Sequence, residues 1–208
     1  MGMRFDLRRA LEIPAVYNVF QKMTRTREYR QRFMARVPIA PGARVLEVGC
    51  GPGTNVEFLP QGQGVQFVGC DADGRYIAHA QQKYGNGTAS FYAMPVGGLR
   101  TLGLDTFDTV LAWGLLHHIS DAEVSTLADE VDDLLESGGT FCTFDPCFTD
   151  RQTLVERVLT ACDRGRYVRY PEHYAALLGA RFTNVTLDVW PPGTILSYSV
   201  TVCIATKE

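Results

Sequence analysis

The most informative segment of the sequence is Val45-Leu-Glu-Val-Gly-Cys-Gly-Pro-Gly-Thr-Asn55. It leaves a short apolar strand, predicted over residues 44–49, and turns sharply at its glycines. Gly49, Gly51 and Gly53 can adopt positive φ angles and let a ligand touch the backbone directly. Their spacing is G-x-G-x-G, whereas a dinucleotide loop has G-x-G-x-x-G and directs a helix N-terminus at a pyrophosphate. The segment therefore indicates a ligand loop outside the dinucleotide class.

Two carboxylates accompany this loop. Glu47 lies two residues before the first glycine, where it would repel a phosphate but could pair with an ammonium group, directly or through water. Asp71 ends the next predicted strand, about 20 residues after the glycines, and a carboxylate at that position accepts both hydroxyls of a ribose. The alternative is that an aspartate here only caps the following helix, and we expect that role for Asp73.

From residue 44 onward the chain alternates predicted strands and helices. The strands are expected at 44–49, 65–70, 89–94, 107–113 and 140–145, and the helices between them at 54–59, 75–84 and from 120 to the glycines at 138–139. Further helices are expected at 150–162 and 171–178, and two final strands at 182–190 and 195–205. Pro191-Pro192-Gly193 joins the final strands, and so short a turn forces antiparallel pairing. This order predicts an α/β fold with a doubly wound sheet and one reversed strand.

Two of these helices carry specific signals. Ser120 and Glu123 match a capping box, in which each side chain satisfies a free backbone N–H at the helix start. Gly138 and Gly139 are expected to end the same helix. The helix at 150–162 is expected to face inward with Leu154, Val155, Val158 and Leu159.

The first 40 residues differ from the rest and predict two helices, with apolar residues at helical spacing in each. We therefore divide the chain into a helical extension at 1–40, able to act as a lid, and a main domain at 41–208. Tyr17 and Phe20 could close over a ligand and exclude water, and plain packing against the sheet explains Phe20 equally well.

Composition narrows the class of protein. The 208 residues carry a formal net charge of −3, which argues against a general nucleic-acid binder but not against a base-modifying enzyme with a small basic groove. No signal-peptide or membrane-span pattern is found, so we expect a cytoplasmic chain with no membrane partner. The six cysteines form no CxxC pair, and we expect no metal site and mostly buried free thiols. The long last strand leaves oligomer formation possible.

At this point a family resemblance becomes plain. The loop at 47–55, Asp71, residues 107–118 and residues 134–141 resemble, in order, the motifs of class I S-adenosylmethionine-dependent methyltransferases over roughly residues 40–205. The resemblance implies a Rossmann-like seven-stranded sheet with the last strand antiparallel and helices on both faces. It implies S-adenosylmethionine as cofactor and S-adenosylhomocysteine as product. It also implies a set of cofactor-binding residues: Glu47, Gly49, Cys50, Gly51, Gly53, Asn55, Asp71, Ala72, Met94, Pro95, Ala112 and Trp113.

One departure from the family concerns adenine. Members often place an aspartate just after the third strand to bind the adenine amino group, but Tyr92-Ala-Met-Pro-Val96 holds no carboxylate. Adenine would then be held by backbone groups and by the packing of Met94.

The family provides no fixed catalytic residue, because in-line transfer from a sulfonium depends mainly on alignment. His117 and His118 follow the fourth strand and are candidate bases or acceptor-binding groups, although packing or capping near Ser120 explains them as well. Asp145 ends the fifth strand and could contact the acceptor or pair with an arginine of segment 163–169. Arg166 lies in that segment, which is either a solvated loop or a lid for an acidic or polar acceptor.

The sequence therefore predicts a methyltransferase that acts on an O, N or C atom of a small-molecule acceptor, with no nucleic-acid partner expected. Two alternatives stay open: a related biosynthetic enzyme such as a cyclase, and a non-catalytic partner subunit that keeps the cofactor pocket.

Overall fold

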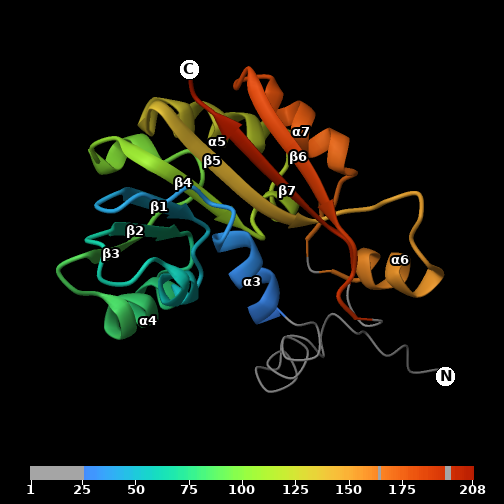
Figure 1. The fold of residues 1–208 in the computed structure, drawn as a ribbon, viewed down its shortest axis with the longest axis horizontal. Helices are drawn as coiled ribbons and strands as arrows, with labels where there is room; N and C mark the ends of the chain where they lie inside the picture. The colour runs from blue at the N-terminus through green and yellow to red at the C-terminus, as the bar shows by residue number, and fades with distance from the viewer. Residues whose placement is uncertain (1–25, 164, 195–197) are drawn as a thin grey trace.

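A computed structural model describes residues 26–163, 165–194 and 198–208. Its centre is one seven-stranded sheet in the order β3-β2-β1-β4-β5-β7-β6 (Figure 1). The strands are β1 (Arg44–Val48), β2 (Gln66–Asp71), β3 (Ala89–Ala93), β4 (Phe107–Trp113), β5 (Leu135–Pro146), β6 (Asn184–Trp190) and β7 (Val200–Thr206). The predicted doubly wound, seven-stranded sheet is confirmed.

The pairing directions place the candidate site. β1 pairs in parallel with β2 on one side and β4 on the other, so the strand order reverses at β1. β7 is antiparallel to both neighbours, β5 and β6, as the reversed strand predicts. Ligands of open α/β sheets bind where the order reverses, beyond the carboxyl ends of the strands. The glycine loop after β1 lies at that point.

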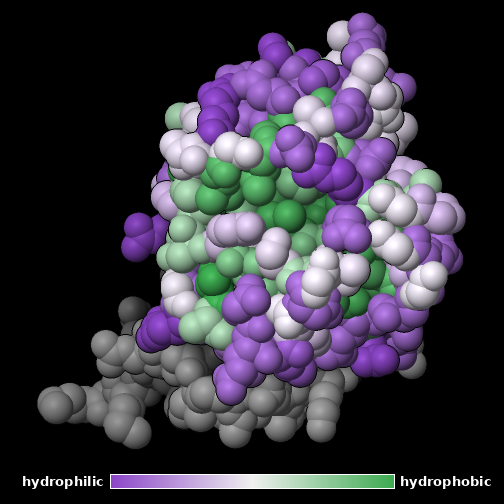
Figure 2. Space-filling view, turned by 90° about the vertical axis from the view of Figure 1, so that its left-hand side faces the viewer, coloured by the Kyte–Doolittle hydropathy of each residue, from purple (hydrophilic) through white to green (hydrophobic). Residues whose placement is uncertain are grey.

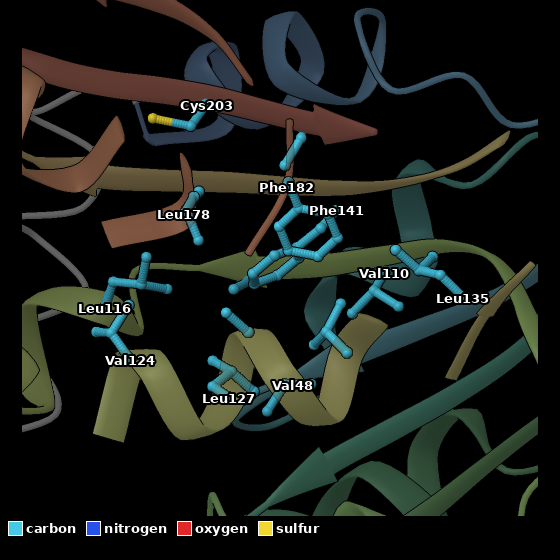
Figure 3. Close-up of a cluster of buried hydrophobic side chains, with 14 of the residues drawn as sticks. Val48, Val110, Leu116, Val124, Leu127, Leu135, Phe141, Leu178, Phe182 and Cys203 are labelled. Atoms are coloured by element: carbon cyan, nitrogen blue, oxygen red, sulfur yellow. The ribbon is translucent and has the colours of Figure 1, made fainter. Parts of the chain in front are cut away.

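Helices cover both faces of the sheet. They are α3 (Thr26–Met34), α4 (Gly74–Tyr84), α5 (Asp121–Leu134), α6 (Leu154–Ala161) and α7 (Pro171–Gly179), with short 3-10 turns η1 (Thr54–Phe58), η2 (Leu99–Leu102) and η3 (Leu116–His118). One apolar cluster joins α5 and α7 to the sheet, and a second joins α3 and α4 to the other face. Figure 3 shows the first cluster, in which Leu127 of α5 and Leu178 of α7 approach Phe141 of β5.

Local signals explain several elements. The capping box of α5 is present: Glu123 N donates to Ser120 Oγ and Ser120 N donates to Glu123 Oε2. Asp73 caps α4 by accepting from the backbone of Arg75, as predicted. The second of the two predicted N-terminal helices is α3, which buries Phe33; the first lies outside the described residues. Four cysteines expected in or beside strands are buried free thiols: Cys50, Cys70, Cys142 and Cys203.

The prediction that Gly138 and Gly139 end the α5 helix is wrong. The helix ends at Leu134, and both glycines lie within β5. Leu135 is buried and pairs with Phe107 of β4, so strand pairing begins before the glycines are reached. Lys207 Nζ donates to the carbonyls of Asp132 and Leu135, which satisfies the end of the helix without a glycine cap.

The inward face predicted for α6 is also wrong. Leu154, Val155 and Val158 are exposed, at 84%, 58% and 60%, while Glu156 and Thr160 are buried. The cause is polar: Glu156 Oε1 accepts from the backbone N–H of Ser199 and from its hydroxyl, at 3.0 and 2.6 Å. Hydrogen bonds therefore decide which face of α6 turns inward, and Leu159 is only half-buried.

The final two strands pair in the antiparallel direction, as predicted. The structure gives β7 from Val200, and residues 195–197 of the predicted strand lie outside the described residues. Two residues just before β7 bond outside the ladder, since Ser199 binds Glu156 and Tyr198 donates its hydroxyl to Asp163 at 2.8 Å.

Figure 2 views the side on which the parallel strands begin, where apolar residues gather within a polar rim. A cavity of about 280 Å³ on this side is lined by strand starts such as Arg44, Gln66 and Phe107. It lies at the opposite edge of the sheet from the glycine loop, so it is separate from the site described next.

Candidate functional site

The loop after β1 folds back onto β2. The backbone N–H groups of Gly49 and Cys50 both donate to the carbonyl of Cys70, at 2.7 and 2.9 Å. Gly49, Gly51 and Gly53 have φ angles of 72°, 53° and 76°, as their spacing predicts. These left-handed conformations favour glycine and give the loop its tight turns.

The three glycines serve different purposes. A Cβ on Gly49 would come 2.9 Å from the Leu115 side chain, and one on Gly53 would come 2.9 Å from Phe91. These two positions therefore allow close packing within the protein. A Cβ on Gly51 would meet nothing within 4 Å in the described part of the chain. The backbone of Gly51 thus faces open space in which a ligand can approach it.

Glu47 lies beneath this loop and is 1% exposed. Its Oε1 accepts a hydrogen bond from the side-chain amide of Asn55, whereas its Oε2 has no partner among the described residues. Burial raises the pKa of Glu47 to about 8, against the opposing effects of Arg30 and Asn55. A buried carboxylate oxygen without a donor is costly, and a ligand ammonium group would relieve that cost.

Asp71 ends β2 beside the loop. Its Oδ2 accepts from the backbone N–H of Gly51 at 2.9 Å, and its Oδ1 accepts from the N–H of Asp73 at 2.8 Å. Each carboxylate oxygen can accept a second hydrogen bond, so a ribose hydroxyl can still bind there. Asp71 therefore both fixes the Gly51 turn and offers acceptors at the edge of the open space.

The predicted adenine region lies at the ends of β2 and β3. Met94 N donates to the carbonyl of Asp71 at 2.9 Å, which holds the segment after β3 beside β2. Ala72 and Pro95 are exposed, and Met94 is half-buried against Gly98. These positions agree with a site lined by backbone and by Met94.

The end of β4 carries an aromatic wall. Trp113 stacks on Phe144 of β5 with a centroid distance of 3.8 Å and an interplanar angle of 4°, and Phe33 of α3 meets both rings edge-on. Trp113 is half-buried and lies at the edge where the site is expected. Ala112 is fully buried in the apolar cluster under α5 and α7, which places its side chain in the core.

Two of the predicted catalytic candidates bind each other. His117 and Asp145 are buried, and Nδ1 of the imidazole lies 2.8 Å from Oδ1 of the carboxylate. Nε2 of the same ring lies 3.1 Å from Oδ1 of Asp163. Asp145 is thus paired with a histidine and not with an arginine of segment 163–169. His118, the neighbouring candidate, is exposed.

At the end of the segment that follows α6, a buried arginine binds several backbone carbonyls. Arg169 is 5% exposed and donates to the carbonyls of Leu116, Ile119 and Tyr167, all at 2.7–2.9 Å. It thereby holds the loop that carries both histidines. Arg166, the predicted lid residue, is exposed. Tyr17 and Phe20 lie outside the described residues.

Sequence reasoning missed three residues that the structure brings to this region. Arg30 donates to Asn55 Oδ1 at 2.8 Å, Asp163 completes the pairing of His117, and Arg169 clamps the histidine loop. The helical spacing of apolar residues in α3 predicts its buried face, but it does not show that Arg30 reaches the glycine loop. For Asp163 and Arg169, the usable signal was the position of the two histidines just after β4.

In residues 26–163, 165–194 and 198–208, no three His, Cys, Asp or Glu side chains are grouped so that they could hold a metal ion. Within the same ranges, no helix has the length and apolar character needed to cross a membrane.

Residues 45–139 match the family described as methyltransferase domain. Among curated proteins, the tRNA U34 carboxymethyltransferase of Pseudoalteromonas translucida (strain TAC 125) is 32% identical over 89 residues, covering 42% of this chain and 27% of that protein. The trans-aconitate 2-methyltransferase of Variovorax paradoxus (strain S110) is 37% identical over 71 residues, covering 34% of this chain and 27% of that protein. The chain thus spans about a quarter of the length of these two relatives.

Among solved structures, human N-acetylserotonin methyltransferase in complex with S-adenosylmethionine superposes with a TM-score of 0.68 at 15% identity. The match covers 100% of this chain and 60% of that one, and it shows a shared fold.

The cofactor of this family is S-adenosylmethionine, a nucleoside with an ammonium group, and the donor-free oxygen of Glu47 and the open backbone of Gly51 fit it. The matched domain includes the glycine loop, Asp71 and the end of β4. Residues 45–139 therefore carry a methyltransferase domain similar to those of class I S-adenosylmethionine-dependent methyltransferases.

Proposed function

We propose that this chain transfers the methyl group of S-adenosylmethionine to a small-molecule acceptor and releases S-adenosylhomocysteine. Two features of the loop carry the proposal together. One is the buried Glu47 oxygen that has no donor among the described residues, and the other is the open turn at Gly51, which a hydrogen bond to Asp71 fixes. In the proposed complex Glu47 receives the ammonium group, Asp71 the ribose hydroxyls, and the segment after β3 the adenine.

The bound sulfonium supplies an activated methyl group, so an acceptor lone pair forms the new bond as the carbon–sulfur bond breaks. The protein must align the acceptor and exclude water, and the aromatic face of Trp113 can stabilise positive charge at the edge of the site. A base is needed only when the acceptor starts protonated with a high pKa. His118 is the better candidate for that role, because both ring nitrogens of His117 already face carboxylates.

Two observations support a small-molecule acceptor: the net charge of the chain and the name of one relative. A net charge of −3 gives the chain no general attraction for a nucleic-acid backbone. The relative named trans-aconitate 2-methyltransferase acts, by its name, on a small acid. The exposed Arg166 beside the histidine loop could bind a carboxylate of such an acceptor. The relative named for tRNA U34 makes RNA the competing acceptor to test.

The first experiment is calorimetric titration with S-adenosylmethionine and, separately, with NADH. We expect binding of S-adenosylmethionine alone, and a loss of that binding in Asp71→Ala. Asp73→Ala is the matched control, since Asp73 is the neighbouring aspartate whose carboxylate caps α4. It should lower stability by about 1 kcal/mol without changing the affinity.

The second experiment measures release of S-adenosylhomocysteine with a panel of small acids, phenols and amines and with bulk tRNA. Release with a small acceptor supports the proposal, and release with tRNA alone overturns its acceptor class. A folded protein that binds S-adenosylmethionine but releases no product with any acceptor would instead favour a cyclase or a partner subunit.

A further inference from the structure

Arg30 joins α3 to the glycine loop. One guanidinium nitrogen, NH1, donates to Asn55 Oδ1 at 2.8 Å and also to the hydroxyl of Thr54. The guanidinium carbon lies 5.2 Å from the centre of the Trp113 ring. Arg30 therefore sits between the start of η1 and the end of β4.

Asn55 passes this contact on to Glu47. Asn55 is 2% exposed, and its amide nitrogen donates to Glu47 Oε1 while its amide oxygen accepts from Arg30. A guanidinium can only donate, and an ionised carboxylate can only accept. The amide of Asn55 therefore has one satisfactory orientation, and the order cation, amide, carboxylate leaves Oε2 as the Glu47 oxygen available to a ligand.

We propose that Arg30 is a positioning residue for cofactor binding, which acts through Asn55 to orient Glu47 toward the ammonium group of S-adenosylmethionine and favours the ionised form of that carboxyl group. The inference rests on cofactor binding as stated under the proposed function. Arg30 makes no contact with the methyl group in this role. It acts on the carboxylate that binds the opposite end of the ligand's amino-acid part.

The charges around Glu47 support this role. Burial raises the pKa of Glu47, Arg30 and Asn55 lower it, and Asp71 of β2 raises it slightly. Cys50 in the loop is neutral, because burial raises the pKa of its thiol. Among the described residues, Arg30 is the cation that opposes the effect of burial. Its removal shifts the pKa of Glu47 further upward, toward the neutral form that cannot pair with an ammonium group.

The test compares Arg30→Gln with Arg30→Lys and with Arg32→Gln. Arg32 is the matched control: it lies on the same helix, and its guanidinium stacks 3.9 Å above the ring of Trp190 instead of reaching Asn55. Melting curves for all variants check that each is folded. Affinity is measured for S-adenosylmethionine, for its decarboxylated form, which keeps the ammonium group, and for 5′-methylthioadenosine, which lacks both groups.

We expect Arg30→Gln to lower the affinity for both S-adenosylmethionine and its decarboxylated form by about tenfold, because one hydrogen bond to a charged group is lost. Binding of 5′-methylthioadenosine should not change, and Arg32→Gln should leave all three affinities as they are. Arg30→Lys should recover most of the loss. In an Asn55→Ala background, Arg30→Gln should add little, since the connecting amide is gone.

The pH profile gives a separate readout. In the wild-type chain, affinity for S-adenosylmethionine should rise with pH as Glu47 ionises around a pKa of about 8. In Arg30→Gln the rise should move to higher pH, and Arg30→Lys should restore it. A helix that was merely loosened would lose affinity without moving this midpoint.

Distinct results overturn the inference. If decarboxylated S-adenosylmethionine binds Arg30→Gln as well as wild type, Arg30 contacts the ligand carboxylate directly and does not act through Glu47. If Arg30→Gln lowers the affinity for 5′-methylthioadenosine by the same factor, Arg30 contributes only general packing. If the wild-type chain binds no S-adenosylmethionine, the proposed function fails with it, whereas equal binding by wild type and Arg30→Gln removes only the role of Arg30.

Discussion

Nδ1 of His117 lies 2.8 Å from Oδ1 of Asp145, and both side chains are buried at the carboxyl edge of the sheet. The other ring nitrogen faces Asp163, which also accepts from the N–H of Gly165 and the hydroxyl of Tyr198. Three donors hold the pKa of Asp163 well below its usual range, despite its burial. The imidazole of His117, placed between the carboxyl groups of Asp145 and Asp163, therefore ties β5, η3 and the segment after α6 together. Burial raises the pKa of Asp145, whereas its hydrogen bond with His117 lowers it.

This arrangement predicts a stability that falls at alkaline pH. Burial lowers the pKa of His117, but the hydrogen bonds that its ring donates to Asp145 and Asp163 outweigh that effect and raise the pKa to about 9. Because the folded pKa lies above the unfolded value, the contribution is fully present below pH 6.5 and is lost as the pH rises through 9. His117→Gln should cost roughly 3 kcal/mol at pH 6, measured by urea unfolding, and less at pH 9.5.

Glu47 titrates in the same range, since its folded pKa is also raised, to about 8. The informative quantity is therefore the difference between wild type and His117→Gln at each pH, which cancels the contribution of Glu47. A difference that stays constant from pH 6 to 9.5 would mean that His117 is buried in its neutral form.

A second prediction concerns Gly51. Its φ is +53° and a Cβ would meet nothing within 4 Å of the described atoms, so Gly51→Ala should fold with a strain of about 1–2 kcal/mol. The methyl group would occupy the space where the ligand touches the backbone, and S-adenosylmethionine affinity should fall at least about tenfold. Gly42→Ala is the matched control, because Gly42 has φ +75° and equally open surroundings before β1.

Thermal melts and calorimetric titration separate the two effects. Both alanine variants should lose similar stability, and only Gly51→Ala should lose cofactor affinity. Equal affinities in the two variants would place the ligand away from the Gly51 turn.

Much of the fold could be predicted because its signals are local. The glycine loop, the capping box of Ser120 and Glu123, and the strand from Phe107 to Trp113 are each set by residues close in sequence. Local hydrogen bonds and side-chain periodicity indicate such elements without knowledge of distant contacts. The same reasoning located Glu47 and Asp71 beside the loop.

The wrong predictions share a different cause. The buried face of α6 depends on Glu156 meeting Ser199, and the early start of β5 depends on Leu135 meeting Phe107. These partners are far apart in the sequence, so no window around either residue reveals them. The pairing of His117 with Asp145 and the contact of Arg30 with Asn55 are equally long-range.

The last prediction separates a buried arginine from an exposed one. Arg169 donates to three backbone carbonyls, and its guanidinium also pairs with Asp121 at the start of α5. Lysine cannot reproduce these directions, so Arg169→Lys loses hydrogen bonds to the carbonyls of Leu116, Ile119 and Tyr167 and should cost about 2–4 kcal/mol. Arg181→Lys is the control: this half-exposed arginine of the turn after α7 also pairs with α5, through Asp132.

Since exposed ion pairs contribute little, Arg181→Lys should cost less than about 1 kcal/mol in the same urea titration. Arg169 also holds the carbonyls of Leu116 and Ile119 on either side of the histidine loop, so its replacement should expose that loop to hydrogen exchange. The amide of His117, which donates to Asp145 Oδ1 at 3.1 Å, is the probe. Unchanged protection of that amide in a destabilised Arg169→Lys variant would show that the His117 pair holds the loop without the arginine.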